Sequence, residues 1–152
     1  MGIVECRTLS TDSKLVGDAG EHFVCYCLAR RGISAALMPA GTKSVDILAT
    51  IDGSAVVSLQ IKASWAQWQP RKWTAGKHQP NHSSAFFYVF CNIWKDLSQE
   101  PEVFVVPSKF VFEHATWHTK MPTFTIAPDK EHLFKGNWGL IETALSGSRV
   151  HP

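Results

Sequence analysis

Hydrophobic and polar positions along the chain predict one long helix near the N-terminus. Between Lys14 and Arg31, apolar residues recur at intervals of three and four. Residues Thr11 to Ser13 offer an N-cap for the first turn, and Gly32 can end the last one. The spacing therefore predicts a helix over 14–31 whose apolar side packs against the rest of the protein.

Two aliphatic segments follow, VDILATI at 45–51 and AVVSLQIKA at 55–63. Both are rich in residues that favour strands, and the Asp-Gly-Ser sequence between them is typical of a turn. We expect a β-hairpin. If its loop has three residues, Ile51 pairs with Ala55, and Asp46 lies directly opposite Gln60.

The rest of the chain predicts further strands at 85–93 and 102–106 and helices at 109–118 and 137–145. Residues 1–10 suit an arm or a short edge strand, and residues 64–84 suit an irregular excursion with several Trp, Pro and Gly. This order predicts an α/β protein with a mixed sheet flanked by helices. The 152 residues fit a single domain, 1–152.

Composition and charge narrow the possible environments. Fifteen Lys and Arg against thirteen Asp and Glu give a net charge of +2, so total charge alone does not indicate a nucleic-acid partner. No apolar run approaches the roughly 18 residues of a membrane span, and the first residues do not resemble a signal peptide. Four Cys without a C-x-x-C motif favour reduced thiols. We expect a cytoplasmic protein that does not associate with membranes.

Local charge differs from the total. The segment 62–82 has four Lys and Arg and no acidic residue, and aromatic side chains alternate with the positive ones. Such a mixture suits contacts to phosphates and bases of DNA. The predicted DNA contacts are Trp65, Trp68, Arg71, Lys72, Trp73 and Lys77. The alternative is a loop whose Trp side chains pack on the core and whose basic groups are only solvated.

A group of polar residues accompanies the predicted hairpin. Gln60 and Lys62 lie two apart in a strand, so they project from the same face. A carboxylate from Asp46 beside the Gln60 amide oxygen can bind a hard divalent cation, with the Lys62 ammonium next to it. This arrangement indicates a metal-dependent phosphodiesterase site. The alternatives are a capping or turn role for Asp46 and an ordinary exposed strand face for Gln60 and Lys62. For Glu21, which lies on the predicted helix, the alternative is a solvated charge on an amphipathic helix.

Four short motifs in this order resemble the PD-(D/E)XK nuclease superfamily. They are Gly17-x-x-Gly20-Glu21, Leu28-x-x-x-Gly32, Val45-Asp46-Ile47-Leu48-Ala49 and Gln60-Ile61-Lys62. The chain is most similar to the Holliday-junction-resolvase-like and small uncharacterised bacterial branches. The resemblance implies a restriction-endonuclease-like core of the α-β-β-β-α-β type over about 14–106, with a helical extension at 107–152. Gln60 stands where most members have a second acidic residue, which makes the chain a Q-x-K variant.

The resemblance implies a DNA endonuclease. Asp46, Gln60 and the Ile61 carbonyl would hold Mg²⁺ or Mn²⁺, with Glu21 contributing directly or through water, and Lys62 would orient the nucleophile or stabilise the transition state. No small organic cofactor is expected. A nuclease this small cuts both strands of a duplex by pairing with a copy of itself or by acting twice, so we expect a homodimer. The alternatives are a catalytically weak or inactive nucleic-acid-binding module and a dimeric protein-interaction protein.

Overall fold

The computed structural model describes residues 13–66, 71–77, 79 and 83–147. None of the helices in these ranges is long and apolar enough to cross a membrane. In chain order the elements are α1 (Ser13–Ala29), β1 (Ser34–Leu37), β2 (Ile47–Thr50), β3 (Val57–Trp65), β4 (Arg71–Thr74), β5 (Phe86–Ile93), β6 (Glu102–Pro107), α2 (Ser108–His114), β7 (Thr123–Ile126), the 3₁₀ turn η1 (Pro128–Lys130), α3 (Glu131–Phe134) and α4 (Gly139–Ser146).

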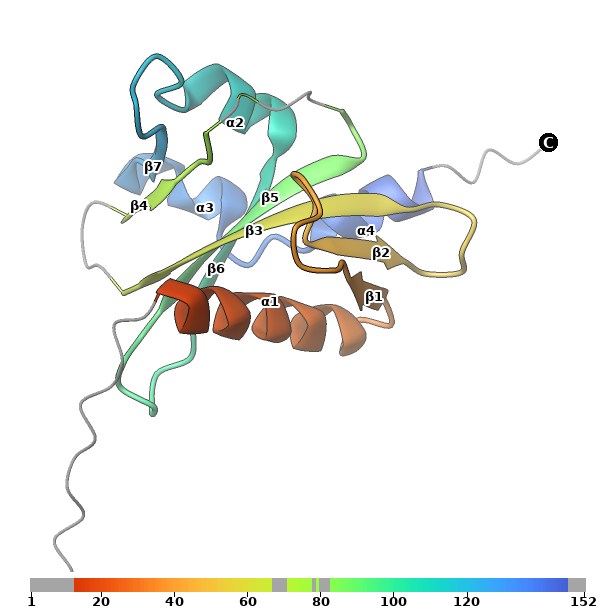
Figure 1. Cartoon of the computed structure of the whole chain (residues 1–152). Coiled ribbons are helices and arrows are strands. Elements are labelled where there is room, and N and C mark those ends of the chain that lie inside the picture. The colour runs from red at the N-terminus through yellow and green to blue at the C-terminus, as the bar shows by residue number, and fades with distance from the viewer. Residues whose placement is uncertain (1–12, 67–70, 78, 80–82, 148–152) are drawn as a thin grey trace, which may run out of the picture.

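A five-stranded sheet in the order β1-β2-β3-β5-β6 forms the centre of the protein, as Figure 1 shows. Strands β3 and β5 are parallel, and the other neighbours are antiparallel. One face of the sheet packs on α1 and α4 through a first hydrophobic core. The opposite face packs on α2, α3 and a second, two-stranded sheet of β4 and β7 through another core. The predicted mixed sheet with flanking helices is confirmed.

The register of the predicted hairpin is confirmed. Ile47 pairs with Leu59 and Ala49 pairs with Val57, which is the alignment that puts Asp46 opposite Gln60. The ladder ends at Ala49 and Val57, so the connection is longer than the predicted three residues. The Thr50 hydroxyl holds this loop, because it donates to the Ala55 carbonyl and accepts from the Gly53 amide.

Helix α1 lies very close to the sheet at Gly20. A Cβ atom built on Gly20 would be 2.7 Å from the Ala63 Cβ, closer than two side chains can approach. The absence of a side chain at this position therefore allows the helix to contact β3. Glu21 is the next residue, so the close contact at Gly20 also fixes the position of the Glu21 backbone relative to β3.

The sequence predictions were wrong or incomplete in three regions. Residues 64–84, expected to be irregular, contain the end of β3 and the whole of β4. The C-terminal part, expected to be a helical extension, also contains β7, and its α4 shares a core with α1. The short strand β1 was not predicted either. The segment 1–10, expected to be an arm or edge strand, lies outside the described residues.

Candidate active site

Asp46 is the centre of the candidate site, and backbone hydrogen bonds hold it from both sides. Its amide donates to the Leu59 carbonyl at 2.9 Å, and its carbonyl accepts from the Met38 amide at 2.8 Å. Its side chain accepts a hydrogen bond from Gln60 Nε2 at 2.8 Å and another from the Ile61 amide at 2.7 Å, both at Oδ2. The half-buried residue is therefore held by four hydrogen bonds, two to its backbone and two to its carboxylate.

The second of these side-chain bonds also orients the Ile61 carbonyl. The β2–β3 ladder extends only as far as Ile47 and Leu59, so the Asp46 carboxylate takes the place of a backbone acceptor for the Ile61 amide. In a strand, the N–H and C=O of one residue point toward the same edge. The Ile61 carbonyl therefore faces the side of the strand where Asp46 lies.

Glu21 lies on α1, near enough to Asp46 for their charges to interact. Burial raises the pKa of its carboxyl, and the negative charge of Asp46 raises it further, followed by that of Asp18. Two neighbouring, partly desolvated carboxylates repel one another, so a nearby positive charge would stabilise their ionised forms. The structure thus brings together the two predicted acidic residues, although they lie on different elements.

Lys62 supplies a positive charge at this site. Burial lowers the pKa of its ammonium, and the nearby Asp46 carboxylate opposes that effect. A Cβ built on Gly76 would be 3.6 Å from Lys62 Nζ, so the backbone after β4 lies close to the ammonium. Gly76 has a φ of +98°, which favours glycine. The sequence analysis did not predict that Gly76 lies near Lys62. The only signal was the presence of a glycine in segment 62–82, which has no acidic residue.

The donor atoms of this site suit a hard divalent cation. The Asp46 and Glu21 carboxylates, the Gln60 amide oxygen and the Ile61 carbonyl are all oxygen ligands of the kind that Mg²⁺ and Mn²⁺ prefer. Among the described residues, no group of three or more His, Cys, Asp or Glu could hold a metal. A cation here would therefore depend on the amide and carbonyl oxygens as well as on the two carboxylates.

Two of the predicted DNA contacts are wrong, because their side chains are buried. Trp73 is 3% exposed, donates through Nε1 to the Cys91 carbonyl at 2.9 Å and packs on Phe90 and Phe104. Arg71 is 8% exposed. Its guanidinium donates to both carboxylate oxygens of Glu102 at 2.7 and 2.8 Å and to Glu131 at 3.0 Å. Both side chains hold β4 in the fold.

The other predicted DNA contacts differ in their surroundings. Lys72 and Lys77 are exposed, so they can reach a ligand. Trp65 is half-buried at the margin of the α1 core, with the Lys95 ammonium 5.6 Å from its ring centroid. By strand alternation, Trp65 lies on the opposite face of β3 from Lys62. Trp68 lies outside the described residues.

These features define an α/β protein with a group of acidic, amide and lysine side chains on β3, immediately before β2 and on α1. The structure is similar to that of a bacterial homing endonuclease, with a TM-score of 0.66 and 13% identity over 93% of this chain and 100% of that one. It is also similar to the Holliday junction resolvase of the archaeal hyperthermophile Archaeoglobus fulgidus, with a TM-score of 0.53 and 14% identity over 83% of this chain and 95% of that one. No protein-family model and no curated protein sequence matches the chain. The predicted restriction-endonuclease-like fold is confirmed.

Proposed function

We propose that the protein is a divalent-metal-dependent DNA endonuclease that hydrolyses phosphodiester bonds. The observation that carries this proposal is the arrangement around Asp46, whose carboxylate binds the Gln60 amide and the Ile61 N–H and interacts with the charges of Glu21 and Lys62. The fold supports the proposal, because it also occurs in a homing endonuclease and a Holliday junction resolvase.

In this proposal, Asp46, Gln60, the Ile61 carbonyl and Glu21 hold Mg²⁺ or Mn²⁺. A bound cation acidifies water and neutralises charge that develops on the phosphate. The protein's own contribution is to fix these oxygens on two strands and a helix before the substrate binds. Fixed polar groups lose little free energy through reorganisation during the reaction.

Lys62 has a separate role in the proposed reaction. Its ammonium donates hydrogen bonds to the attacking water or to a phosphate oxygen, and so orients the nucleophile or stabilises the transition state. Because Lys62 is partly buried, its electrostatic interactions are less screened than those of a surface lysine.

A second candidate is a nuclease-fold module that binds nucleic acid without cutting it. The observation that favours this function is at Gln60, which turns its amide nitrogen rather than its oxygen toward Asp46. An amide also brings no negative charge to a cation. For the endonuclease we propose a homodimer, because one copy of the active site can cut only one strand of a duplex at a time.

Cleavage of supercoiled plasmid and of a four-way DNA junction, each with Mg²⁺, Mn²⁺ or EDTA, tests the proposal. We expect Asp46→Asn and Lys62→Ala to lower cleavage by at least about 100-fold while DNA binding persists. The matched controls are Asp129→Asn and Lys130→Ala, which change exposed charges of the same type in η1. Binding without cleavage under every condition, unchanged by Asp46→Asn, would instead identify the non-catalytic module. Sedimentation of the wild-type chain with and without DNA tests the homodimer.

A further inference from the structure

The β4–β7 sheet is a two-stranded ribbon with one buried and one exposed face. Its register pairs Lys72 with Thr125 and Thr74 with Thr123. The buried face consists of Arg71, Trp73, Phe124 and Ile126. On the outer face, Lys72, Thr74 and Thr125 are exposed, while Thr123 is half-buried and bound to Thr116.

The ribbon is firmly attached to the rest of the protein. The Trp73 indole donates to the Cys91 carbonyl of β5, and the Arg71 guanidinium pairs with Glu102 of β6 and Glu131 of α3. The ribbon also ends in a backbone hydrogen bond from Ala75 to Pro122 at 2.8 Å. Its outer face is therefore held in one position, so binding of a ligand there costs little conformational entropy of the ribbon.

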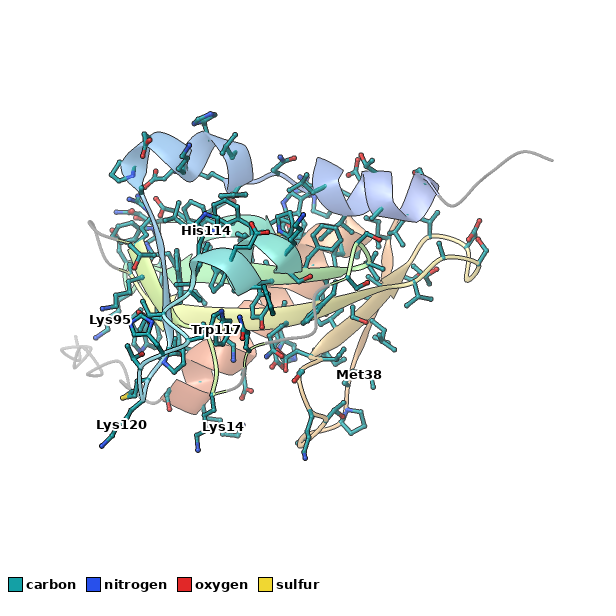
Figure 2. The ribbon with its side chains drawn as sticks, turned by 90° about the horizontal axis from the view of Figure 1, so that it is seen from above. Lys14, Met38, Lys95, His114, Trp117 and Lys120 are labelled. Carbon is teal, nitrogen blue, oxygen red and sulfur yellow. The ribbon has the colours of Figure 1, made fainter. Side chains whose placement is uncertain are left out.

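The ribbon and its flanking residues are positively charged. Segments 71–77 and 115–126 contain four Lys and Arg, namely Arg71, Lys72, Lys77 and Lys120, and no Asp or Glu. Since Arg71 is already paired with carboxylates, the three lysines supply the charge available to a ligand. Figure 2 shows Lys120, from the loop before β7, extending toward the same side of the molecule as Lys14, from the start of α1. Lys14 forms an ion pair of 2.8 Å with Asp18, so it adds little to the charge of the ribbon lysines. Such a surface attracts a polyanion.

The ribbon also leads directly to the candidate active site. Gly76 follows Thr74 by two residues, and a Cβ built on it would be 3.6 Å from Lys62 Nζ. At about 3.3 Å per extended residue, Thr74 lies within about 7 Å of Gly76. The ribbon is therefore close to the candidate active site along the chain.

We propose that the β4–β7 ribbon enters the major groove of duplex DNA and contacts base edges through Thr74 and Thr125, with Lys72 on a phosphate. This inference rests on the proposed function and deepens it, because it names the surface that holds the DNA. The major groove of B-DNA, about 12 Å wide, admits a two-stranded ribbon. Threonine can contact bases there through its hydroxyl group and the thymine methyl group through its own methyl.

Binding of the full chain to a random-sequence duplex pool, in EDTA so that no cleavage occurs, tests this proposal. The bound duplexes are sequenced, and affinity is measured at several salt concentrations. We expect Lys72→Ala to bind about tenfold more weakly and to reduce the salt-dependence slope by about 0.9. Thr74→Val and Thr125→Val keep the shape of each side chain, so they should change the enriched sequence with little change in that slope.

The matched controls are Arg30→Ala at the far end of α1 and Thr143→Val on α4, which remove an exposed charge and an exposed hydroxyl away from the ribbon. The proposal would be overturned if the control variants changed duplex binding as much as the ribbon variants do. It would also be overturned by tighter binding of a single-stranded DNA or RNA pool, or by no binding of the wild type. Ribbon-dependent binding without any cleavage in Mg²⁺ or Mn²⁺ would refute only the endonuclease. Cleavage that is unaffected by all three ribbon variants would refute only the ribbon.

Discussion

Gln60 donates a hydrogen bond of 2.8 Å to Asp46 Oδ2 from the adjacent strand, at the position where a second acidic side chain would place a like charge. An amide here stabilises the Asp46 carboxylate without a cation, whereas a carboxylate would need one. The residue at position 60 therefore sets how strongly the fold of this region depends on metal.

Gln60→Glu should consequently make the protein less stable without metal and more responsive to it. The substitution loses a hydrogen bond and puts two carboxylates opposite one another, so we expect a loss of about 1 to 2 kcal/mol in EDTA. Added Mg²⁺ or Mn²⁺ should restore that stability, and cleavage should reach half its maximum at lower metal concentration. Thermal unfolding with and without metal measures the first effect.

Gln99→Glu is the matched control for this substitution, because it puts a carboxylate beside Asp96 on the exposed surface. Solvent screens that pair, so its effect should be smaller and should not depend on metal. If both variants lose the same stability and neither responds to Mg²⁺, residue 60 is not next to a cation site.

Gly20 and Gly17 offer a comparison within one helix. A Cβ on Gly20 would clash with Ala63 at 2.7 Å, whereas a Cβ on Gly17 meets nothing within 4 Å. Gly20→Ala should cost about 1 to 3 kcal/mol and lower cleavage, because α1 must move away from β3 and carry Glu21 with it. Gly17→Ala should be neutral or stabilising by up to about 1 kcal/mol. Urea unfolding and plasmid cleavage measure both. Equal behaviour of the two variants would contradict the close approach of α1 to β3.

Gly76 tests whether the backbone after β4 positions Lys62. Both Gly76 and Gly53 have positive φ values, +98° and +83°, so Ala at either position is strained by about 1 kcal/mol. Of the two, only Gly76 is close to Lys62, where an added Cβ would be 3.6 Å from Nζ. We expect Gly76→Ala to reduce the cleavage rate beyond its effect on stability, whereas Gly53→Ala should affect stability alone. Cleavage at a temperature where both variants remain folded separates these effects, and equal rates would contradict a positioning role.

Local sequence information was sufficient for the parts of the fold near the candidate site. The spacing of apolar residues predicted α1, and strand alternation with the turn at Asp52-Gly53-Ser54 predicted that Asp46 lies opposite Gln60. In each case the residues that determine the structure lie within about 15 positions of one another, so periodicity and turn chemistry carry the information.

The structure of segment 62–82, which has no acidic residue, depends on partners elsewhere in the chain. Trp73 binds the Cys91 carbonyl, and Arg71 pairs with Glu131, so both became structural side chains through partners in other elements. Strand β4 likewise pairs with β7, about fifty residues later. A single sequence does not show such long-range partners. For the same reason it could not distinguish basic residues that hold the fold from those that face solvent, such as Lys72.

The ion pair between Arg71 and Glu102 should make stability depend on acid pH. Hydrogen bonds from the Arg71 guanidinium and then from the Asn92 amide lower the pKa of the Glu102 carboxyl from an ordinary value of 4.5 to about 2. Burial of the carboxyl opposes this effect in part. Because the folded pKa is the lower one, the stabilisation is complete above about pH 4.5 and is lost as pH falls toward about 2. Glu102→Gln should therefore cost about 2 to 3 kcal/mol at neutral pH, with the difference from wild type shrinking as pH falls through that interval. Urea unfolding across this range measures the difference.

Glu113→Gln is the control for this prediction, because its exposed partner Lys109 is 4.0 Å away. We expect no measurable loss in its free energy of unfolding. An effect of Glu102→Gln that does not depend on pH would contradict the role of the Arg71–Glu102 ion pair.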